Sequence, residues 1–237
     1  MVGLSTAAPG PAQLDTDARD WWSLGSRPQR LGFLVIGSIR YTDATDRQRE
    51  LLDRGKRAAR MLPNVYRVMA NSPALLDTYL TGYEQFRAES GFDPVEQEVV
   101  FLTISAENAC EYCMAAHSLV ADTVARVPHA VTEAVRGGTP IPDPRLEALS
   151  TFTRQLLLER GRPTEDQVAA FRAAGYTDQH ALHLVLALAV KTLSNYTNHL
   201  ADTPLDTVFR AREWKAFTIA TRTFQALTHR RRSGSTR

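Results

Sequence analysis

Two cysteines three residues apart, Cys110 and Cys113, are the side chains of this sequence best suited to chemistry, and they are its only cysteines. A pair with this spacing at the start of a helix can cycle between a dithiol and a disulfide. Asn108, with Glu111 three residues later, predicts such a helix start, where the partial positive charge favours a thiolate. His117 follows Cys113 by four residues, which places it on the same helix face. The pattern predicts thiol–disulfide chemistry.

Glu98 is the expected partner of His117, because the face of its predicted helix is otherwise apolar. If the chain turns near residues 107–108 and the two helices run antiparallel, each of the two residues is about nine positions from the turn. At about 1.5 Å per residue they then reach similar heights. We expect Glu98 to orient His117 or to share a proton with it.

Other interpretations of these residues stay open. Cys110 and Cys113 could be buried small residues, since free cysteine is often buried. With His117 and Glu98 they could bind zinc, although structural zinc sites usually draw on two separated cysteine pairs and this sequence has one. His117 could be an ordinary helix histidine, and Glu98 a structural acid paired with an arginine.

The elements that position these residues are predicted to be helices, because apolar residues recur every three or four positions between N-cap and glycine or proline signals. Alternating strand patterns are absent apart from a short apolar run at 31–39. We therefore predict an all-α fold: a single helical domain at 19–225, between a disordered arm at 1–18 and a disordered basic tail at 226–237. The expected helices span about 43–60, 72–90, 93–107, 108–125, 128–137, 144–161, 164–175 and 177–200.

The composition favours a reducing compartment and small-molecule chemistry. The formal net charge is +2, and residues 210–237 carry eight Lys or Arg against one Asp or Glu, so the basic excess belongs to the tail and gives no reason to expect nucleic-acid binding. No run of 18 apolar residues predicts a membrane span, and the first residues lack the pattern of a secretory signal. A cytoplasmic protein that does not bind membranes is expected.

The pattern of Glu98, Cys110, Cys113 and His117 resembles the alkylhydroperoxidase D-like group of the carboxymuconolactone decarboxylase superfamily. The resemblance covers roughly residues 70–125, and the helices to about 205 fit the same type of fold. It implies an all-helical fold with the cysteine pair at the N-terminus of a central helix. It also implies a homo-oligomer that needs no cofactor and no metal.

The resemblance also implies roles. Cys113 would attack a peroxide, Cys110 would resolve the sulfenic acid to a disulfide, and Glu98 with His117 would form the proton relay. An external dithiol or thioredoxin-like reductant would restore the thiols. One departure is Tyr112, which stands where the best-known peroxidases of this type have a histidine, and a phenol with a pKa of about 10 is a poor base at neutral pH.

Asn195, Asn198 and His199 share one face of the last long helix. We expect them to cap the helix end and to bond to the following loop, with a substrate pocket or an oligomer seam as the alternative. The leading functional hypothesis is a thiol-dependent peroxidase or disulfide oxidoreductase. The alternatives are a non-catalytic helical oligomer that senses redox state or holds a metal, and a non-redox, decarboxylase-like enzyme that uses His117 and Glu98.

Overall fold

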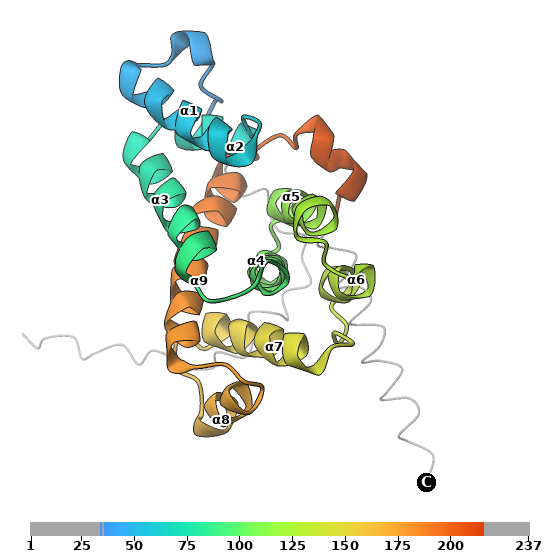
Figure 1. The fold of residues 1–237 in the computed structure, drawn as a ribbon. Coiled ribbons are helices and arrows are strands. Elements are labelled where there is room, and N and C mark those ends of the chain that lie inside the picture. The colour runs from blue at the N-terminus through green and yellow to red at the C-terminus, as the bar shows by residue number, and fades with distance from the viewer. Residues whose placement is uncertain (1–33, 35, 216–237) are drawn as a thin grey trace, which may run out of the picture. The chain divides into compact units, whose positions relative to one another are not determined.

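The computed structural model describes Leu34 and residues 36–215, and within these residues every regular element is a helix (Figure 1). The all-α prediction is therefore confirmed for this part of the chain, and the described part of the apolar run at 31–39 forms no strand. The predicted arm at 1–18, the tail at 226–237 and the domain residues 19–33 and 216–225 lie outside the described residues. None of the described helices combines the length and the apolar character needed to cross a bilayer.

The helices follow one another with short connections. In order they are η1 Tyr41–Asp43, α1 Asp46–Ala59, α2 Asn64–Met69, α3 Pro73–Glu89, α4 Pro94–Glu107, α5 Glu111–Val120, η2 Ala121–Ala125, α6 His129–Gly137, α7 Pro144–Leu158, α8 Glu165–Ala173, α9 Asp178–Ala201 and η3 Thr207–Arg212. Of these, η1 and η3 are 3₁₀ turns and η2 is a π turn that continues α5.

Local signals explain most helix starts. Helices α1, α4, α8 and α9 each begin with a capping box, in which the N-cap side chain and the residue three positions later satisfy each other's backbone N–H groups. Helices α3, α4 and α7 also carry a proline in the first turn, where no N–H is needed. These signals are short-range, so the sequence shows them directly.

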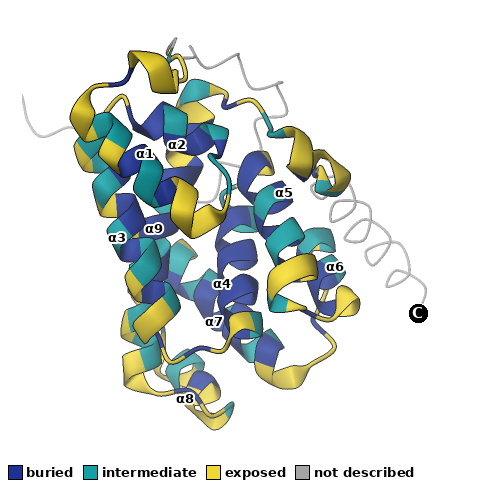
Figure 2. Cartoon of the chain, turned by 45° about the horizontal axis from the view of Figure 1, so that its top comes forward, coloured by how far each residue is buried: buried dark blue, intermediate teal, exposed yellow. Residues whose placement is uncertain are grey.

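Helix α4 is the centre of the fold. Every residue from Glu96 to Ser105 is buried, and α4 packs against α5, α6, α7 and α9 (Figure 2). A helix that is buried on all sides must be apolar nearly all round, and α4 is, apart from a few polar side chains that all have partners to bind. Glu98 is one of these, so the fold places this carboxylate in the interior.

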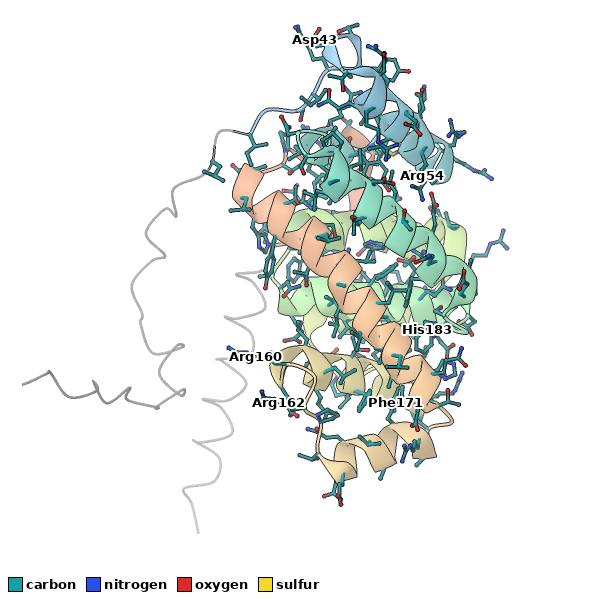
Figure 3. All side chains as sticks on the ribbon, turned by 90° about the vertical axis from the view of Figure 1, so that its left-hand side faces the viewer. Asp43, Arg54, Arg160, Arg162, Phe171 and His183 are labelled. Atoms are coloured by element: carbon teal, nitrogen blue, oxygen red, sulfur yellow. The ribbon has the colours of Figure 1, made fainter. Side chains whose placement is uncertain are left out.

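Helix α9 lies alongside α3 at close range. A Cβ added to Gly82 of α3 would lie 2.8 Å from Cγ2 of Val190, so only glycine permits this approach. Helices α3 and α9 lie side by side (Figure 3). Lys191, which follows Val190, is fully buried.

Three short elements were not predicted from the sequence. The turn η1 has three residues, and α2 and η3 have six each, too few for a periodic apolar pattern to be recognised. Packing fixes α2 and η3. Four residues of α2 are buried, and Phe209 of η3 packs edge-on against Tyr112 of α5.

Candidate functional site

The turn between α4 and α5 sets the position of both cysteines. Ala109 has a left-handed φ of 52° and its N–H donates to Ala106 O at 2.9 Å, while Cys110 N–H donates to Ser105 O at 2.9 Å. These two bonds form a Schellman motif, which ends α4 and lets α5 start at once. The two helices therefore run back along each other, as the hairpin argument expects.

The predicted cap at Asn108 is wrong by two residues. Asn108 is the C-cap of α4, with its N–H donating to Ile104 O at 3.0 Å, and the N-cap of α5 is Cys110. A capping pattern alone cannot tell the end of one helix from the start of the next when both fall within three residues. Cys110 is therefore the N-cap and Cys113 lies in the first turn of α5, close to the partial positive charge of the helix N-terminus.

Both cysteines are buried free thiols. Cys110 is 0% exposed and Cys113 is 4% exposed. The amide of Asn198 on α9 donates to the sulfur of Cys113 at 3.3 Å and lies 3.8 Å from the sulfur of Cys110. Ser194 Oγ lies 3.8 Å from the sulfur of Cys113. The pair is thus covered by polar groups of α9.

The two thiols differ in acidity. Burial on its own would raise the pKa of Cys113, but a hydrogen bond from Cys110, the positive charge of Lys191 and the neighbouring His117 together lower it well below the ordinary value. The hydrogen bond to Cys113, together with burial, raises the pKa of Cys110. The arrangement therefore favours ionisation of Cys113 before Cys110.

Glu98 and His117 are in direct contact. Nδ1 of His117 lies 2.9 Å from Oε2 of Glu98, and both side chains are buried. The other carboxylate oxygen of Glu98 accepts a hydrogen bond from the guanidinium of Arg87 on α3. Burial would raise the pKa of Glu98, but the charge of Arg87 and the contact with His117 outweigh it and lower the pKa to about 2.

The pKa shifts of Glu98 and His117 indicate which nitrogen of the imidazole ring carries the hydrogen. Burial and the charge of Lys191 lower the pKa of His117, so the ring is neutral at neutral pH. Because Glu98 is ionised and can only accept, Nδ1 of His117 carries the hydrogen and Nε2 carries the lone pair. The contact with Glu98 therefore favours one tautomer of His117. Glu98 contacts both His117 and Arg87, so the arginine partner considered from the sequence is present beside the expected histidine contact.

Tyr112 has no place in this proton path. Its hydroxyl donates to the carboxylate of Asp206 and accepts from Val65 N–H at 3.4 Å. Burial and Asp206 raise its pKa. The residue between the cysteines therefore ties the start of α5 to α2 and to the loop before η3.

The polar face at the end of α9 differs from the sequence expectation. Asn195 is 0% exposed and accepts from Asn108 Nδ2 at 2.9 Å, and Asn198 reaches the sulfurs. These two side chains line the cysteine site and do not cap the helix end. His199 is exposed and stacks near Tyr196, with ring centroids 6.2 Å apart.

Lys191 is the site residue that the sequence reasoning missed. It stands in an apolar stretch of α9 that was interpreted as core, and its charge contributes to the pKa of both cysteines. The available signal was a lone lysine in an otherwise apolar run, which is unusual because lysine is almost never fully buried without a partner. Among the described residues, no group of three or more His, Cys, Asp or Glu side chains is arranged to hold a metal ion.

Comparisons with known proteins add information on the fold. No family model matches the sequence, and no curated protein matches it. A crystal structure described as an alkylhydroperoxidase AhpD core, an uncharacterized peroxidase-related protein from Ralstonia eutropha JMP134, matches with a TM-score of 0.65 and 22% identity. The match covers 74% of this chain and 93% of that chain.

Two further structures match at similar strength. One is an uncharacterized peroxidase-related protein from Silicibacter sp. TM1040, with a TM-score of 0.62 and 17% identity, covering 79% of this chain and 96% of that chain. The other is the debrominase Bmp8 in complex with 2,3,4-tribromopyrrole, with a TM-score of 0.63 and 14% identity, covering 76% of this chain and 95% of that chain. At these identities the likeness is one of fold.

Proposed function

We propose that this chain, which has the alkylhydroperoxidase D-like helical fold, is a thiol-dependent peroxidase or disulfide oxidoreductase that works through Cys110 and Cys113. The observation that carries the proposal is the unequal environment of the two thiols. The amide of Asn198 donates to the sulfur of Cys113 at 3.3 Å, and the neighbours of Cys113 lower its pKa whereas those of Cys110 raise it. The thiolate is the nucleophile in this chemistry, so the pair has a built-in order of reaction.

The proposed reaction has two steps. The Cys113 thiolate attacks the outer oxygen of a hydroperoxide, the O–O bond breaks, and the leaving alkoxide takes a proton to become an alcohol. Cys110, after giving its proton to a base, attacks the resulting sulfenic acid, so that water leaves and a Cys110–Cys113 disulfide forms. His117, neutral and with its lone pair on Nε2, is the proposed base, and Glu98 keeps it in that tautomer.

The remaining parts of the proposal concern partners. An external dithiol, such as a thioredoxin-like protein, would reduce the disulfide and complete the cycle. We further propose a homo-oligomer that works in the reducing cytoplasm without a cofactor. The solved neighbours include peroxidase-related proteins and a debrominase, so a brominated aromatic compound is a second electrophile to test.

The test is to follow hydroperoxide consumption with dithiothreitol as reductant, for the wild type and for Cys113→Ser and Cys110→Ser. We expect the Cys113→Ser rate to fall to that of the buffer. Cys110→Ser should still react once and accumulate a sulfenic acid that dimedone labels, because its resolving thiol is missing. The two variants are matched controls, since each removes one sulfur from the same turn.

Different outcomes would support the rival functions. Turnover that survives Cys113→Ser would contradict the proposal. Activity on a lactone or carboxylate that survives loss of both cysteines would favour a non-redox enzyme based on His117 and Glu98. A reversible disulfide with no turnover of peroxide, disulfide or bromoarene would favour a redox-sensing oligomer.

A further inference from the structure

Lys191 is a buried lysine without a hydrogen-bond partner. It is 0% exposed, and its Nζ bonds to no atom in the part of the chain that the structure describes. It lies on α9 one turn before Ser194 and two turns before Asn198, whose side chains both reach the sulfur of Cys113. A buried ammonium group is costly unless a negative charge lies close to it. The surroundings of Lys191 therefore decide its role.

The nearest buried carboxylate is already used. Glu98 binds Arg87 through one oxygen and His117 through the other. Arg87 and Lys191 both lie at the ring of Phe101, with the Arg87 guanidinium carbon 4.8 Å and Lys191 Nζ 5.5 Å from its centroid. Two cations thus lie at one aromatic ring with Glu98 as the carboxylate beside them, and the other buried carboxylate of α4, Glu96, is paired with Arg145. One negative charge is missing next to Lys191.

Few groups near Cys113 can supply that charge. Beside the site lie Tyr66 on α2, Tyr79, Tyr83 and Arg87 on α3, Glu98 on α4, Cys110, Tyr112 and His117 on α5, Lys191 on α9, and Asp206 before η3. The other carboxylates of α3, α4, α5 and α9 are exposed or are paired with Arg or Lys side chains. Burial raises the pKa of each of the four tyrosines, so all are neutral. The carboxylate of Asp206 accepts hydrogen bonds from the hydroxyl of Tyr112 and from the N–H of Asn64. The sulfur of Cys113 is what remains.

We infer that Lys191 is the counter-ion of the Cys113 thiolate, and that it makes the cysteine pair more oxidising by favouring the dithiol state. The inference rests on the proposed thiol–disulfide function of the same site. In this role Lys191 supplies charge, and Asn198 and Ser194 supply hydrogen bonds, all from one face of α9. The charge of Lys191 stabilises the Cys113 thiolate, whereas a histidine next to Cys113 would promote the same thiolate by taking its proton.

The effect on the disulfide follows from charge balance. Forming the Cys110–Cys113 bond removes two electrons and one proton from a thiolate and a thiol. With a hydroperoxide as oxidant and one further proton from solvent, the products are the disulfide, an alcohol and water. Lys191 takes no part in this exchange of protons and electrons, but the negative charge opposite it is lost. The oxidised state therefore carries an uncompensated buried cation, which raises the reduction potential of the pair.

The test is Lys191→Met, which keeps the length and apolar stem of the side chain but removes the charge. The pKa of Cys113 is measured from the pH dependence of iodoacetamide alkylation, with peptide mass spectrometry to identify the modified cysteine. We expect the pKa of Cys113 to rise by about one unit or more. At pH values below that pKa, this means about tenfold less thiolate than in the wild type. Equilibration with a glutathione buffer should show a pair about tenfold harder to reduce, or about 30 mV lower in potential.

Three further variants complete the experiment. Lys56→Met removes an exposed lysine of α1 in the same way and should change neither value. Lys191→Arg keeps the positive charge, whereas Lys191→Gln removes it. The pKa of Cys113 and the reduction potential of the pair should therefore stay closer to the wild-type values in Lys191→Arg. Circular dichroism identifies the folded variants. Unchanged acidity and potential in a folded, uncharged variant would overturn the inference.

The wild type alone provides a second route if the uncharged variants do not fold. Thiolate absorbance near 240 nm should show Cys113 titrating well below the ordinary thiol range, and titration at or above that range would overturn the inference. Neither readout uses turnover. A protein without peroxidase activity but with the expected shifts would contradict only the proposed function, and an active one without them would contradict only the role of Lys191.

Discussion

Glu98 satisfies two neighbours with one carboxylate. Arg87 on α3 binds one oxygen and His117 on α5 binds the other, and the carboxylate itself is fully buried. Arg87 also donates to Tyr83 Oη at 2.8 Å and to Gln97 Oε1 at 3.0 Å, so the guanidinium is held in place independently. Glu98 therefore contributes to stability as well as to the orientation of His117.

Glu98→Gln tests this double role. The pKa of Glu98 is about 2 in the folded protein against an ordinary value of 4.5, so its contribution to stability is complete above pH 4.5 and is lost as the pH falls through 2. We expect the variant to lose about 2 kcal/mol at pH 7, because a buried guanidinium loses its charged partner. We also expect its stability to fall less steeply than that of the wild type between pH 4.5 and 2. Urea unfolding at several pH values measures both effects.

A matched control is Glu84→Gln, which changes a half-exposed carboxylate paired with Arg54 on the surface. An exposed ion pair of this kind contributes less than about 1 kcal/mol, so this variant should remain near the wild type. Equal effects of the two substitutions, or an unchanged pH profile in Glu98→Gln, would contradict the role given to Glu98.

At the same scale, the sequence predicted the residues that spacing controls. Cys110, Cys113 and His117 lie within one helix, and Glu98 lies at the matching height of a hairpin partner, so their proximity followed from helix geometry. The positions of Arg87 and Lys191 depend on how α3 and α9 pack against α4. No spacing along the chain encodes that packing, so the sequence could mark Lys191 as unusual but could not place either residue at the site.

At the scale of elements, the α4–α5 turn uses an alanine where glycine is the usual residue. Ala109 adopts a left-handed conformation with a φ of 52° and is exposed. This conformation costs a residue with a Cβ about 1–2 kcal/mol, whereas glycine adopts it freely. The turn that positions both cysteines is therefore formed at the expense of some local strain.

Ala109→Gly should stabilise the protein by up to about 1 kcal/mol, since relief of strain exceeds the extra chain entropy of glycine. The control is Ala106→Gly, one turn earlier inside α4, which should destabilise by about 1 kcal/mol because glycine is a poor helix former. Urea unfolding of the reduced proteins measures both. Destabilisation by both substitutions would contradict the Schellman assignment.

The mistaken cap at Asn108 belongs to this scale too. Thr164 and Thr177, the predicted first residues of two later helices, are the N-caps of α8 and α9, and a loop precedes each of these helices. At Asn108 the capping pattern falls inside a tight helix-to-helix turn. The backbone there is still bonded to α4, so the Schellman motif determines the boundary instead.

For the whole molecule, the helical character and most helix boundaries were predictable, because capping signals and apolar periodicity are local. The arrangement around α4 was not, apart from the hairpin. The resemblance indicated the fold, and the structural neighbours match it across most of their length. The homo-oligomer, the reductant and the cytoplasmic location stay predictions.

The outer face of α9 is the surface on which the homo-oligomer can be tested. Figure 3 shows α9 on the side turned to the viewer. Leu182, Val185, Tyr196 and Leu200 are each more than half exposed, and their spacing places them on one face of this helix. The helix has 24 residues and is about 36 Å long, with two of these side chains toward each end. All four side chains of this apolar stripe are uncharged. In a symmetric dimer the stripe of a second copy, running antiparallel, would pack against the stripe of the first.

We predict that the chain forms a homo-oligomer through this stripe, and that Leu182→Glu with Val185→Glu shifts it toward the monomer. Each charge would be placed against apolar surface of the partner, where it is poorly solvated. Light scattering after size-exclusion chromatography measures the mass over a range of concentrations. The control is Leu158→Glu at the end of α7, which is 60% exposed and away from the stripe, and it should leave the mass unchanged.

A monomeric wild type would contradict the oligomer. An oligomer that tolerates the double substitution would place its interface elsewhere. Because Lys191 and Asn198 occupy the opposite face of the same helix, dissociation should also reveal whether pairing of α9 supports the cysteine site, through a change in the alkylation rate of Cys113.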